Sequence, residues 1–516
     1  MQETLSENNK KIIKNTLALY FRQIIILIVS LYTSRVILRT LGIEDYGINN
    51  VVGGIVAMLS FITSSLSATT QRFLSVELGK NDFIKLKQIF SNSLSLHLIY
   101  IFFTVIIAET AGIWFFKNKL VIPYERITAA YWVYQFSVIS FVVSVFFTPF
   151  EGAIKAHEKF NFYAKLSILE VILKLAIVYL ILYSRYDKLI TYSFLLMCVV
   201  ILNKIILFIY SYKYFEECRI RFTWFKDSIR PLLGYNIFTI INSISALIRY
   251  QGLNIVLNFY YGPILNAAHG IASQILATLT SFTNNAALAV QPQIIMSYTQ
   301  NDKQRLWSLV EKSSRLFFYL FLFLSLPFIL EIHTVLYIWL GDYPDYTPIF
   351  TRLFLLETIT SVWIIPVIYA NSAVGKLLPV TISNVISRLI ILFCAIYIGY
   401  NNISPNYIYI SVIVFQGIHL IICTIIILKH QLEFSLKKYF FDVFIPIIRT
   451  SFFVVSVPIV LHIFLSKSIF SSCLVLLATF FWSALIIFFI GLKSQEKLLI
   501  LNRLRYFVRN IFSNNK

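Results

Sequence analysis

Ionisable side chains inside long apolar segments are the residues of this sequence whose types and positions could do chemistry. Most of them are basic, and a cation in an apolar span is costly unless it faces a water-filled cavity or a partner. The candidates are Arg22, Arg35, Lys204, Arg249 and Arg388. Arginine binds a diphosphate with planar, bidentate donors, and lysine binds it as a point charge. The pattern therefore predicts a cationic cavity that takes an anionic substrate such as a diphosphate.

Acidic side chains are rarer in these segments. Glu109 and Glu170 are the candidates for ion coupling, because an exporter of cationic drugs or metal ions would need a dominant acid in its first half. Glu170 has Lys174 four residues later, and such a pair on one helix can form an ion pair. The acids alone therefore leave a cation-coupled exporter as the alternative.

Enzyme and metal motifs are missing from the sequence. We find no G-x-x-x-x-G-K-[ST], G-x-S-x-G or H-E-x-x-H pattern, the seven histidines have no ligand spacing, and the five cysteines form no C-x-x-C pair. No loop is long enough for an aqueous catalytic domain such as a membrane polymerase would need. We predict no enzymatic activity, no cofactor and no metal site.

The composition is that of a membrane protein. Of the 516 residues, 58% are hydrophobic and only 13% are charged, and the mean hydropathy is +0.77. A soluble domain has about 25% charged residues, and a chain this apolar cannot bury its apolar side chains in one water-soluble core.

Apolar segments long enough to span a bilayer recur along the whole chain. A span needs about 20 residues, and on that rule we count about 14. They lie near residues 16–38, 48–68, 90–114, 128–149, 163–183, 189–211, 233–258, 266–288, 315–338, 346–369, 379–399, 407–428, 440–464 and 469–491. The first has no cleavage site and is predicted to remain uncleaved.

Lysine and arginine are unevenly distributed between the loops. If the N-terminus is cytoplasmic, the inner segments hold about four times as many as the outer ones. This bias predicts cytoplasmic N- and C-termini in the cytoplasmic (inner) membrane. It also accounts for most of the net charge of +20, so we predict membrane lipids and no nucleic acid as partners.

The sequence also contains an internal repeat. A shift of 220 residues aligns Gly42 with Gly262, Gln71 with Gln291, and Asn81-Asp82 with Asn301-Asp302. Both copies begin on the same side, which indicates parallel repeats with the substrate between them. The predicted parts are a six-helix lobe at 1–211, a basic linker at 212–230, a second six-helix lobe at 231–429, two additional helices at 430–491 and an amphipathic basic cytoplasmic tail at 492–516.

Several motifs resemble a known family. The run Ser34–Asn50, the segments Ala68–Phe73 and Gly79–Asp82, the loop Trp339–Thr347 and the turn Gly375-Lys376 are similar to the corresponding parts of Wzx-type polysaccharide and O-antigen repeat-unit flippases. These belong to the multidrug/oligosaccharidyl-lipid/polysaccharide (MOP) superfamily. The resemblance extends over most of the chain.

This resemblance implies an all-α polytopic membrane protein with a MATE-like, V-shaped pair of six-helix lobes and two C-terminal helices. It implies a transporter that flips an undecaprenyl-diphosphate-linked oligosaccharide, such as an O-antigen, capsule or exopolysaccharide repeat unit, from the inner to the outer leaflet. A polymerase of the same pathway is an expected partner. The alternatives are a multidrug exporter of the same fold, a flippase for another polymer precursor, and a membrane polysaccharide polymerase.

Overall fold

The computed structural model is helical, with no strand among the residues that it describes. These are residues 15, 19–30, 32–33, 36–37, 40–42, 45, 48–49, 52–53, 56, 60–119, 122–219, 224–465, 468–494 and 496–498. The first two predicted spans therefore lie partly outside the described residues, as does the predicted tail from residue 499 onward.

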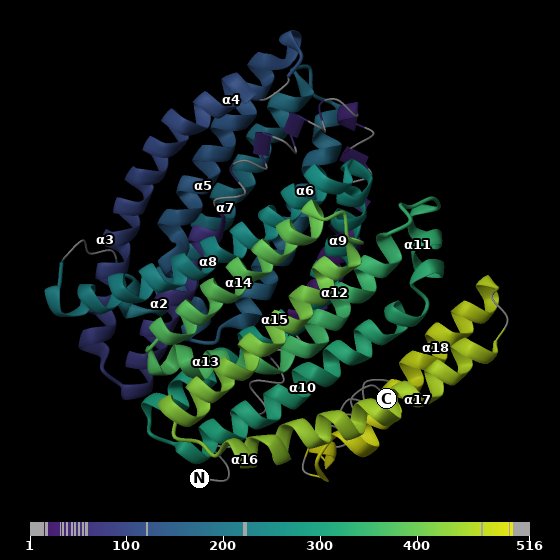
Figure 1. Cartoon of the computed structure of the whole chain (residues 1–516). Helices are drawn as coiled ribbons and strands as arrows, with labels where there is room; N and C mark the ends of the chain where they lie inside the picture. Colours follow the sequence, from purple (N-terminus) through teal and green to yellow (C-terminus); the bar gives the residue numbers. More distant parts are fainter. Residues whose placement is uncertain are drawn as a thin grey trace, which may run out of the picture. The chain divides into compact units, whose positions relative to one another are not determined.

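Long helices follow one another along the chain (Figure 1). They are α2 (Ser60–Lys80), α3 (Phe83–Ile107), α4 (Ile113–Lys119), α5 (Ile127–Ala156), α6 (Phe160–Leu182), α7 (Lys188–Tyr214), α8 (Lys226–Tyr261), α9 (Pro263–Thr299), α10 (Lys303–Leu330), α11 (Ile332–Leu340), α12 (Thr347–Ser361), α13 (Ile365–Val374), α14 (Leu378–Tyr400), α15 (Asn406–Thr424), α16 (Leu436–Tyr439), α17 (Ile445–Phe464) and α18 (Ile469–Ile486). Short 3₁₀ and π turns extend several of them.

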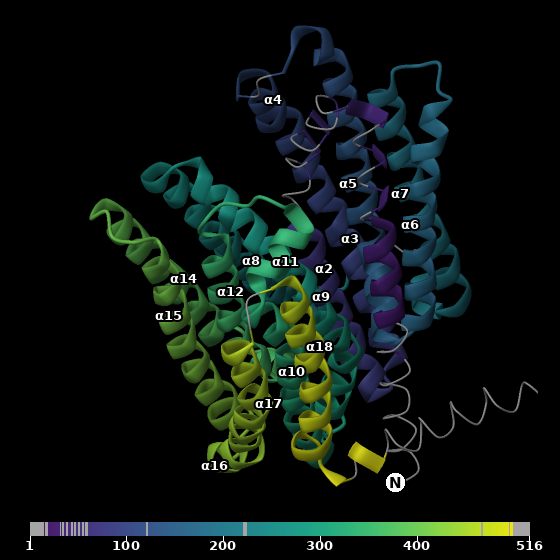
Figure 2. The ribbon, with the colours of Figure 1, turned by 90° about the vertical axis from the view of Figure 1, so that its right-hand side faces the viewer.

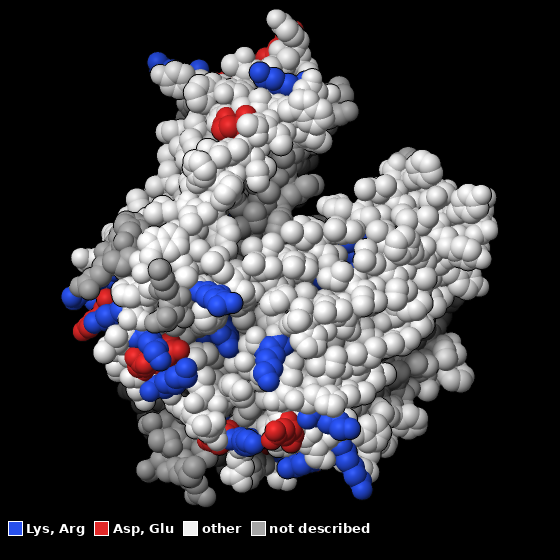
Figure 3. Space-filling model, turned by 60° about the vertical axis from the view of Figure 1, so that its left-hand side comes forward, with Lys and Arg blue, Asp and Glu red and all other residues white. Residues whose placement is uncertain are grey.

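Ten helical stretches among the described residues are long and apolar enough to cross a membrane, and a shorter apolar helix covers Leu19–Ser30. The predicted spans at 163–183 and 266–288 fall on α6 and α9, which are long helices outside that set of ten. The chain is thus a multi-pass membrane protein, and the count of about 14 spans stays a prediction. Charged side chains leave broad uncharged areas on the face drawn in Figure 3, as expected of helices that contact lipid tails.

Two compact units make up the chain, and neither is continuous in sequence. Unit 1 holds residues 1–247, 288–306 and 369–381, and unit 2 holds residues 248–287, 307–368 and 382–516. The predicted lobes at 1–211 and 231–429 are continuous segments, and that division stays a prediction.

Within unit 1, α5 packs along α7 and α2, and α6 packs along α7 (Figures 1 and 2). One apolar core of this unit includes Phe90, Phe150 and Leu94, all fully buried. Within unit 2, α12 packs along α15, and α17 and α18 form a hairpin at the end of the described chain.

The internal repeat is visible in the backbone. Gly42 and Gly262 have positive φ angles of 82° and 86°, and Asn81 and Asn301 have φ angles of 58° and 55°. Glycine and asparagine are the residues that adopt this left-handed conformation most readily. At both asparagines the backbone bonds are those of a Schellman motif, from Asp82 N to Glu77 O at 3.0 Å and from Asp302 N to Ser297 O at 3.1 Å.

The aspartate after each of these asparagines then caps the next helix. Asp82 accepts a hydrogen bond from the amide of Lys85 at 3.0 Å, and Asp302 accepts one from the amide of Arg305 at 2.9 Å. Residues 220 positions apart therefore make the same turn, which is the local evidence for a duplicated element.

An ionic cluster in unit 1 joins Asp45, in the first of the family-like motifs, to the starts of α5 and α7. Arg126 donates to Asp45 from Nε at 2.7 Å and to Asp187 from Nη1 at 2.6 Å. Asp187 also caps α7 by accepting from the amides of Leu189 and Ile190, each at 3.0 Å. Partial burial raises the pKa of Asp187, but the bonds from Arg126 and the two amides outweigh it and hold that pKa below its ordinary value of 3.8.

We predict that Asp187→Ala lowers the free energy of unfolding by about 1–3 kcal/mol, because it removes a helix cap and an ion pair together. Asp187→Asn keeps the cap and should cost less than about 1 kcal/mol. The measurement is the thermal unfolding of the purified chain in detergent, with Asp345→Ala as an exposed aspartate control.

The destabilisation by Asp187→Ala should also shrink as the pH falls below 3.8. Because the pKa of Asp187 is lower in the folded chain than in the unfolded chain, the carboxylate stabilises the fold above pH 3.8. This stabilisation is lost at lower pH, as the carboxylate of the folded chain is protonated. Equal effects of the alanine and asparagine variants would contradict the capping role.

Candidate functional site

An arginine–glutamate pair lies inside the helices of unit 2. Arg249 of α8 donates from Nη1 to Oε1 of Glu357 on α12 at 3.0 Å, and their side chains are 28% and 14% exposed. Both helices belong to stretches that are able to span a membrane. A charge in such surroundings needs a partner, because removing one member of a buried pair costs about 3–5 kcal/mol.

A second predicted cation lies close to this pair. Arg388 of α14 is within electrostatic range of both Arg249 and His419. Arg249 thus lies between a carboxylate and a second arginine, and these three side chains together carry one positive charge in excess. That excess makes the cluster a place where an anion is stabilised.

Two histidines and a tyrosine surround these charges. His269 Nδ1 lies 2.6 Å from the hydroxyl of Tyr409, and His419 Nδ1 lies 2.8 Å from the hydroxyl of Ser383. Arg249 is within electrostatic range of His269, and Glu357 of Tyr409. The side chains come from α9, α14 and α15, so five helices of unit 2 contribute to one polar cluster. We call Arg249, Glu357, Arg388, His269 and His419 the unit 2 cluster.

Apolar packing holds the helices of the unit 2 cluster in place. Leu253 and Leu257 on α8, Phe350 and Phe354 on α12, and Ile391 on α14 belong to one buried group. The ring of His269 also lies edge-on to that of Phe354, with centroids 5.2 Å apart. The polar groups are thus fixed by surrounding side chains that do not ionise.

Unit 1 contains a second group of buried charges. Glu151 of α5 accepts from Lys155 at 2.8 Å and from Lys204 of α7 at 3.1 Å. Lys155 and Arg22 both lie over the ring of Tyr163, at 5.6 and 5.2 Å from its centroid. We call Arg22, Glu151, Lys155 and Lys204 the unit 1 cluster. It has three cations and one acid.

A cavity of about 440 Å³ borders the unit 1 cluster. Arg22 and Glu170 both line it, and Arg22 Nη1 donates to Ser167 Oγ at 3.4 Å. Lys174 donates to Glu170 at 2.7 Å, as its spacing of four residues predicted. Because this carboxylate also accepts from Asn203 at 3.3 Å, it is occupied by local partners.

The structure thus places the predicted site residues in different surroundings. It brings Arg249 and Arg388 together in unit 2, and Arg22 and Lys204 together in unit 1. Glu109 lies apart from both clusters on the π turn Ala108–Gly112, is exposed, and accepts from Gln135 at 3.4 Å. Arg35 lies outside the described residues.

Sequence reasoning did not select the acids, one cation and the two histidines of these clusters as site residues. Glu151 and Lys155 are four residues apart on one helix, a spacing that signals a pair but that we did not single out. Glu357 is 108 residues from its partner, and no local pattern connects the two. Among the described residues, no group of histidine, cysteine, aspartate or glutamate could hold a metal ion.

Solved structures of transporters share this fold. A point mutant of a MATE transporter matches with a TM-score of 0.70 and 13% identity, over 80% of this chain and 94% of that one. MATE in complex with MaD3S matches with a TM-score of 0.67 and 14% identity, over 81% of this chain and 95% of that one. A third match is a MOP superfamily transporter from Pyrococcus furiosus, which is described as having a binding pocket of reversed polarity. Its TM-score is 0.66 at 14% identity, over 82% of this chain and 97% of that one. The predicted MATE-like helical fold is confirmed.

No curated protein matches the chain in sequence. A family model does: the model described as polysaccharide biosynthesis protein matches residues 12–297, which is more than half of the 516 residues. The resemblance seen in the first motifs is thereby confirmed. The chain belongs to the polysaccharide biosynthesis protein family and has the fold of the MATE transporters of the MOP superfamily.

Proposed function

We propose that this protein moves an undecaprenyl-diphosphate-linked oligosaccharide from the inner to the outer leaflet of the cytoplasmic membrane, with both termini in the cytoplasm. The cargo would be a repeat unit of O-antigen, capsule or exopolysaccharide. Membership of a polysaccharide biosynthesis family supports the class of cargo, and the transporter fold supports the mode of action.

The observation that carries the proposal is the Arg249–Glu357 pair with Arg388 beside it. A diphosphate can replace the carboxylate as the partner of Arg249, because a planar guanidinium binds phosphate and carboxylate oxygens in the same bidentate way. The arginine is then never left unpaired in an apolar environment. Exchange of one anion for another makes binding reversible, which transport requires.

The unit 1 cluster offers the same exchange with different residues. Glu151 is shared by Lys155 and Lys204, so one lysine can turn to a phosphate while the other keeps the carboxylate paired. Lysine binds as a point charge through a flexible stem. We infer that the two lobes alternate in exposing these cations to the two sides of the membrane, as the rocking of parallel repeats would do.

The multidrug exporter alternative finds less support in the contacts. A site for cationic drugs would present a carboxylate that is not neutralised by its neighbours. Glu170, Glu151 and Glu357 each have a basic partner within 3.1 Å. Glu109, the other predicted coupling acid, is exposed and accepts from Gln135. Around Glu151 and Glu357 the named cations outnumber the acids, which favours an anionic cargo.

We predict that Arg249→Gln abolishes transport. The test is expression in a bacterium that lacks its own O-antigen flippase and has the matching repeat unit, followed by measurement of polymer-bearing lipopolysaccharide. Loss of a bidentate charge-assisted contact of about 1.5–3 kcal/mol should lower transport by at least about tenfold.

Two double variants separate this role from folding. Arg249→Gln with Glu357→Gln leaves no unpaired buried charge, so we expect stability close to wild type but no recovery of transport. Arg315→Gln with Glu496→Gln neutralises another buried pair, 3.0 Å apart, and should leave transport intact. Full polymer in the first double variant would contradict the cationic site.

Glu357→Gln should have the opposite effect on binding. Without the competing carboxylate, Arg249 is available to the diphosphate, so we expect the affinity for undecaprenyl diphosphate in nanodiscs to rise about tenfold. Transport should fall, because no carboxylate at position 357 is then available to displace the diphosphate from Arg249 and release it. An affinity that equals that of the wild type would argue against exchange at Arg249.

Lys204→Gln should lower transport with little loss of stability. Glu151 keeps its bond to Lys155 at 2.8 Å, so the free energy of unfolding should change by about 1 kcal/mol. The same complementation assay measures transport, and thermal unfolding measures stability. Lys213→Gln, at the end of the same helix, is the control. Equal transport by both variants would exclude Lys204 from the site.

A further inference from the structure

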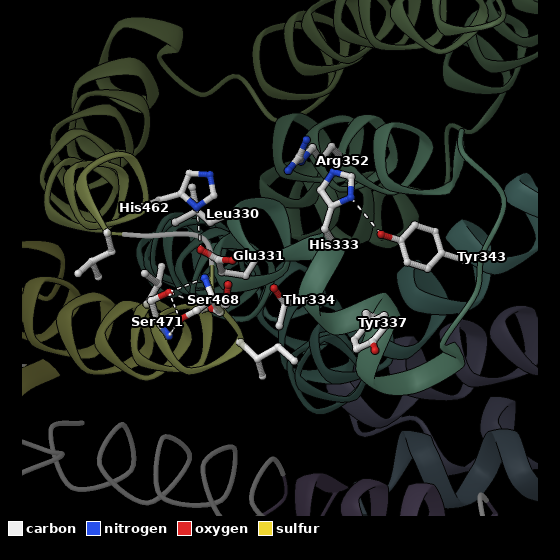
Figure 4. A pocket seen from close by; sticks show the side chains of 14 residues that line it. Leu330, Glu331, His333, Thr334, Tyr337, Tyr343, Arg352, His462, Ser468 and Ser471 are labelled. Atoms are coloured by element: carbon white, nitrogen blue, oxygen red, sulfur yellow. Dashed lines mark hydrogen bonds and ion pairs between the residues drawn. The ribbon is translucent and has the colours of Figure 1, made fainter.

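A separate cavity of about 680 Å³ lies in unit 2, away from the residues of the unit 2 cluster (Figure 4). Its walls are the junction of α10 and α11, the start of α12, and the turn of the α17–α18 hairpin. This volume falls in the range of about 300–1,000 Å³ that is usual for small-molecule sites. In the proposed orientation the cavity is at the outer side of the membrane.

The cavity is lined by hydrogen-bonding groups. Glu331, whose side chain is only 8% exposed, lies 2.7 Å from Nδ1 of His462. On another wall, His333 Nδ1 lies 3.1 Å from the hydroxyl of Tyr343. Figure 4 shows both pairs facing the same space, together with the serines of the hairpin turn; three of the four residues come from the region around α11, and His462 comes from α17. Polar groups that can donate or accept hydrogen bonds therefore line the cavity on more than one wall.

Local backbone features place these side chains at the cavity. Glu331 is the single residue between α10 and α11, with φ −107° and ψ 33°, and this break in the helix lies at the wall of the cavity. Gly341, with φ 75°, ends α11 and turns the chain so that Tyr343 faces back toward His333. The loop Trp339–Thr347, whose motif contributes no residue to the cation clusters, thus supplies Tyr343 to the cavity.

Two tyrosines add apolar faces to the polar lining. Tyr337 and Tyr343 both line the cavity, and the side chain of Tyr337 is 58% exposed. A ligand that matches has many hydroxyl groups and an apolar ring face, because tyrosine offers a flat apolar surface with a polar tip. The charges include one acid, Glu331, and one arginine, Arg352. That balance does not favour a phosphate.

We propose that this cavity binds one sugar ring of the oligosaccharide cargo, as a carbohydrate subsite distinct from the cation clusters. The assignment of the ring to the cargo rests on the proposed function. Glu331 and His462 would bond the ring hydroxyls, and Tyr337 and Tyr343 would pack against its apolar face. The subsite would hold the sugar after the head group has left the cations.

The test is saturation-transfer NMR on the full chain in nanodiscs, with methyl glycosides of glucose, N-acetylglucosamine, rhamnose and glucuronic acid as probes. We expect transfer to at least one glycoside, and none to glycerol. Tyr337→Ala should weaken that binding about fivefold through the lost ring contact. Tyr407→Ala, an equally exposed tyrosine at 55% against 58%, should leave it unchanged.

A second variant guards against a merely structural effect. Glu331→Gln keeps the size of the side chain and a hydrogen-bonding amide, so it should fold and still bind the glycoside more weakly. The inference is overturned if no probe shows transfer, or if Tyr337→Ala and Glu331→Gln both bind like the wild type.

Failure of this inference is distinguishable from failure of the proposed function. Transport that depends on Arg249, with no glycoside binding, would remove the subsite and keep the diphosphate site. If glycoside binding depends on Tyr337 and Glu331 but transport does not depend on Arg249, the sugar subsite is supported and the diphosphate site is ruled out.

Discussion

The pairing of charge in an apolar environment is the constraint on which the polar clusters of this protein depend. A single arginine or lysine among lipid-facing helices is too costly to keep without a partner, so Arg249 holds Glu357 and Lys204 holds Glu151. Each partner comes from another helix, so the same bond that stabilises the charge also fixes two helices together. Replacing such a partner by a substrate anion is therefore both a binding event and a change in helix contacts.

Not every buried pair has such a role. Arg315 is only 2% exposed and is bonded to Glu496 at 3.0 Å, with Glu311 at 3.6 Å, and Lys493 in turn pairs with Glu311. Two acids thus balance two cations here, whereas cations outnumber acids among the residues named in the unit 1 and unit 2 clusters. The charge balance, rather than burial itself, separates the candidate anion sites from a contact that fastens the segment after α18 to α10.

The fold was largely predictable from the sequence, because it rests on periodic and local signals. Apolar runs predicted the helices, and the shift of 220 residues predicted equivalent turns that the backbone bears out at Asn81 and Asn301. The cations of the site were predictable one by one, since a charge in an apolar run is conspicuous. Their partners were not, because Glu357 is paired across 108 residues and only the folded chain brings it to Arg249. The cavity beside Glu331 was not predicted, because its wall joins segments that are far apart in the sequence.

The matched turns at Asn81-Asp82 and Asn301-Asp302 are what the duplication of an ancestral element would leave behind. Two identical halves would have presented the same chemistry twice. In the present chain one copy carries lysines around a shared glutamate, and the other carries arginines beside histidines. The two copies thus differ in the chemistry that they present, and the proposed cargo, with one acidic end and one neutral end, would meet two different faces. Broken symmetry of this kind would give a transporter a preferred orientation for its cargo.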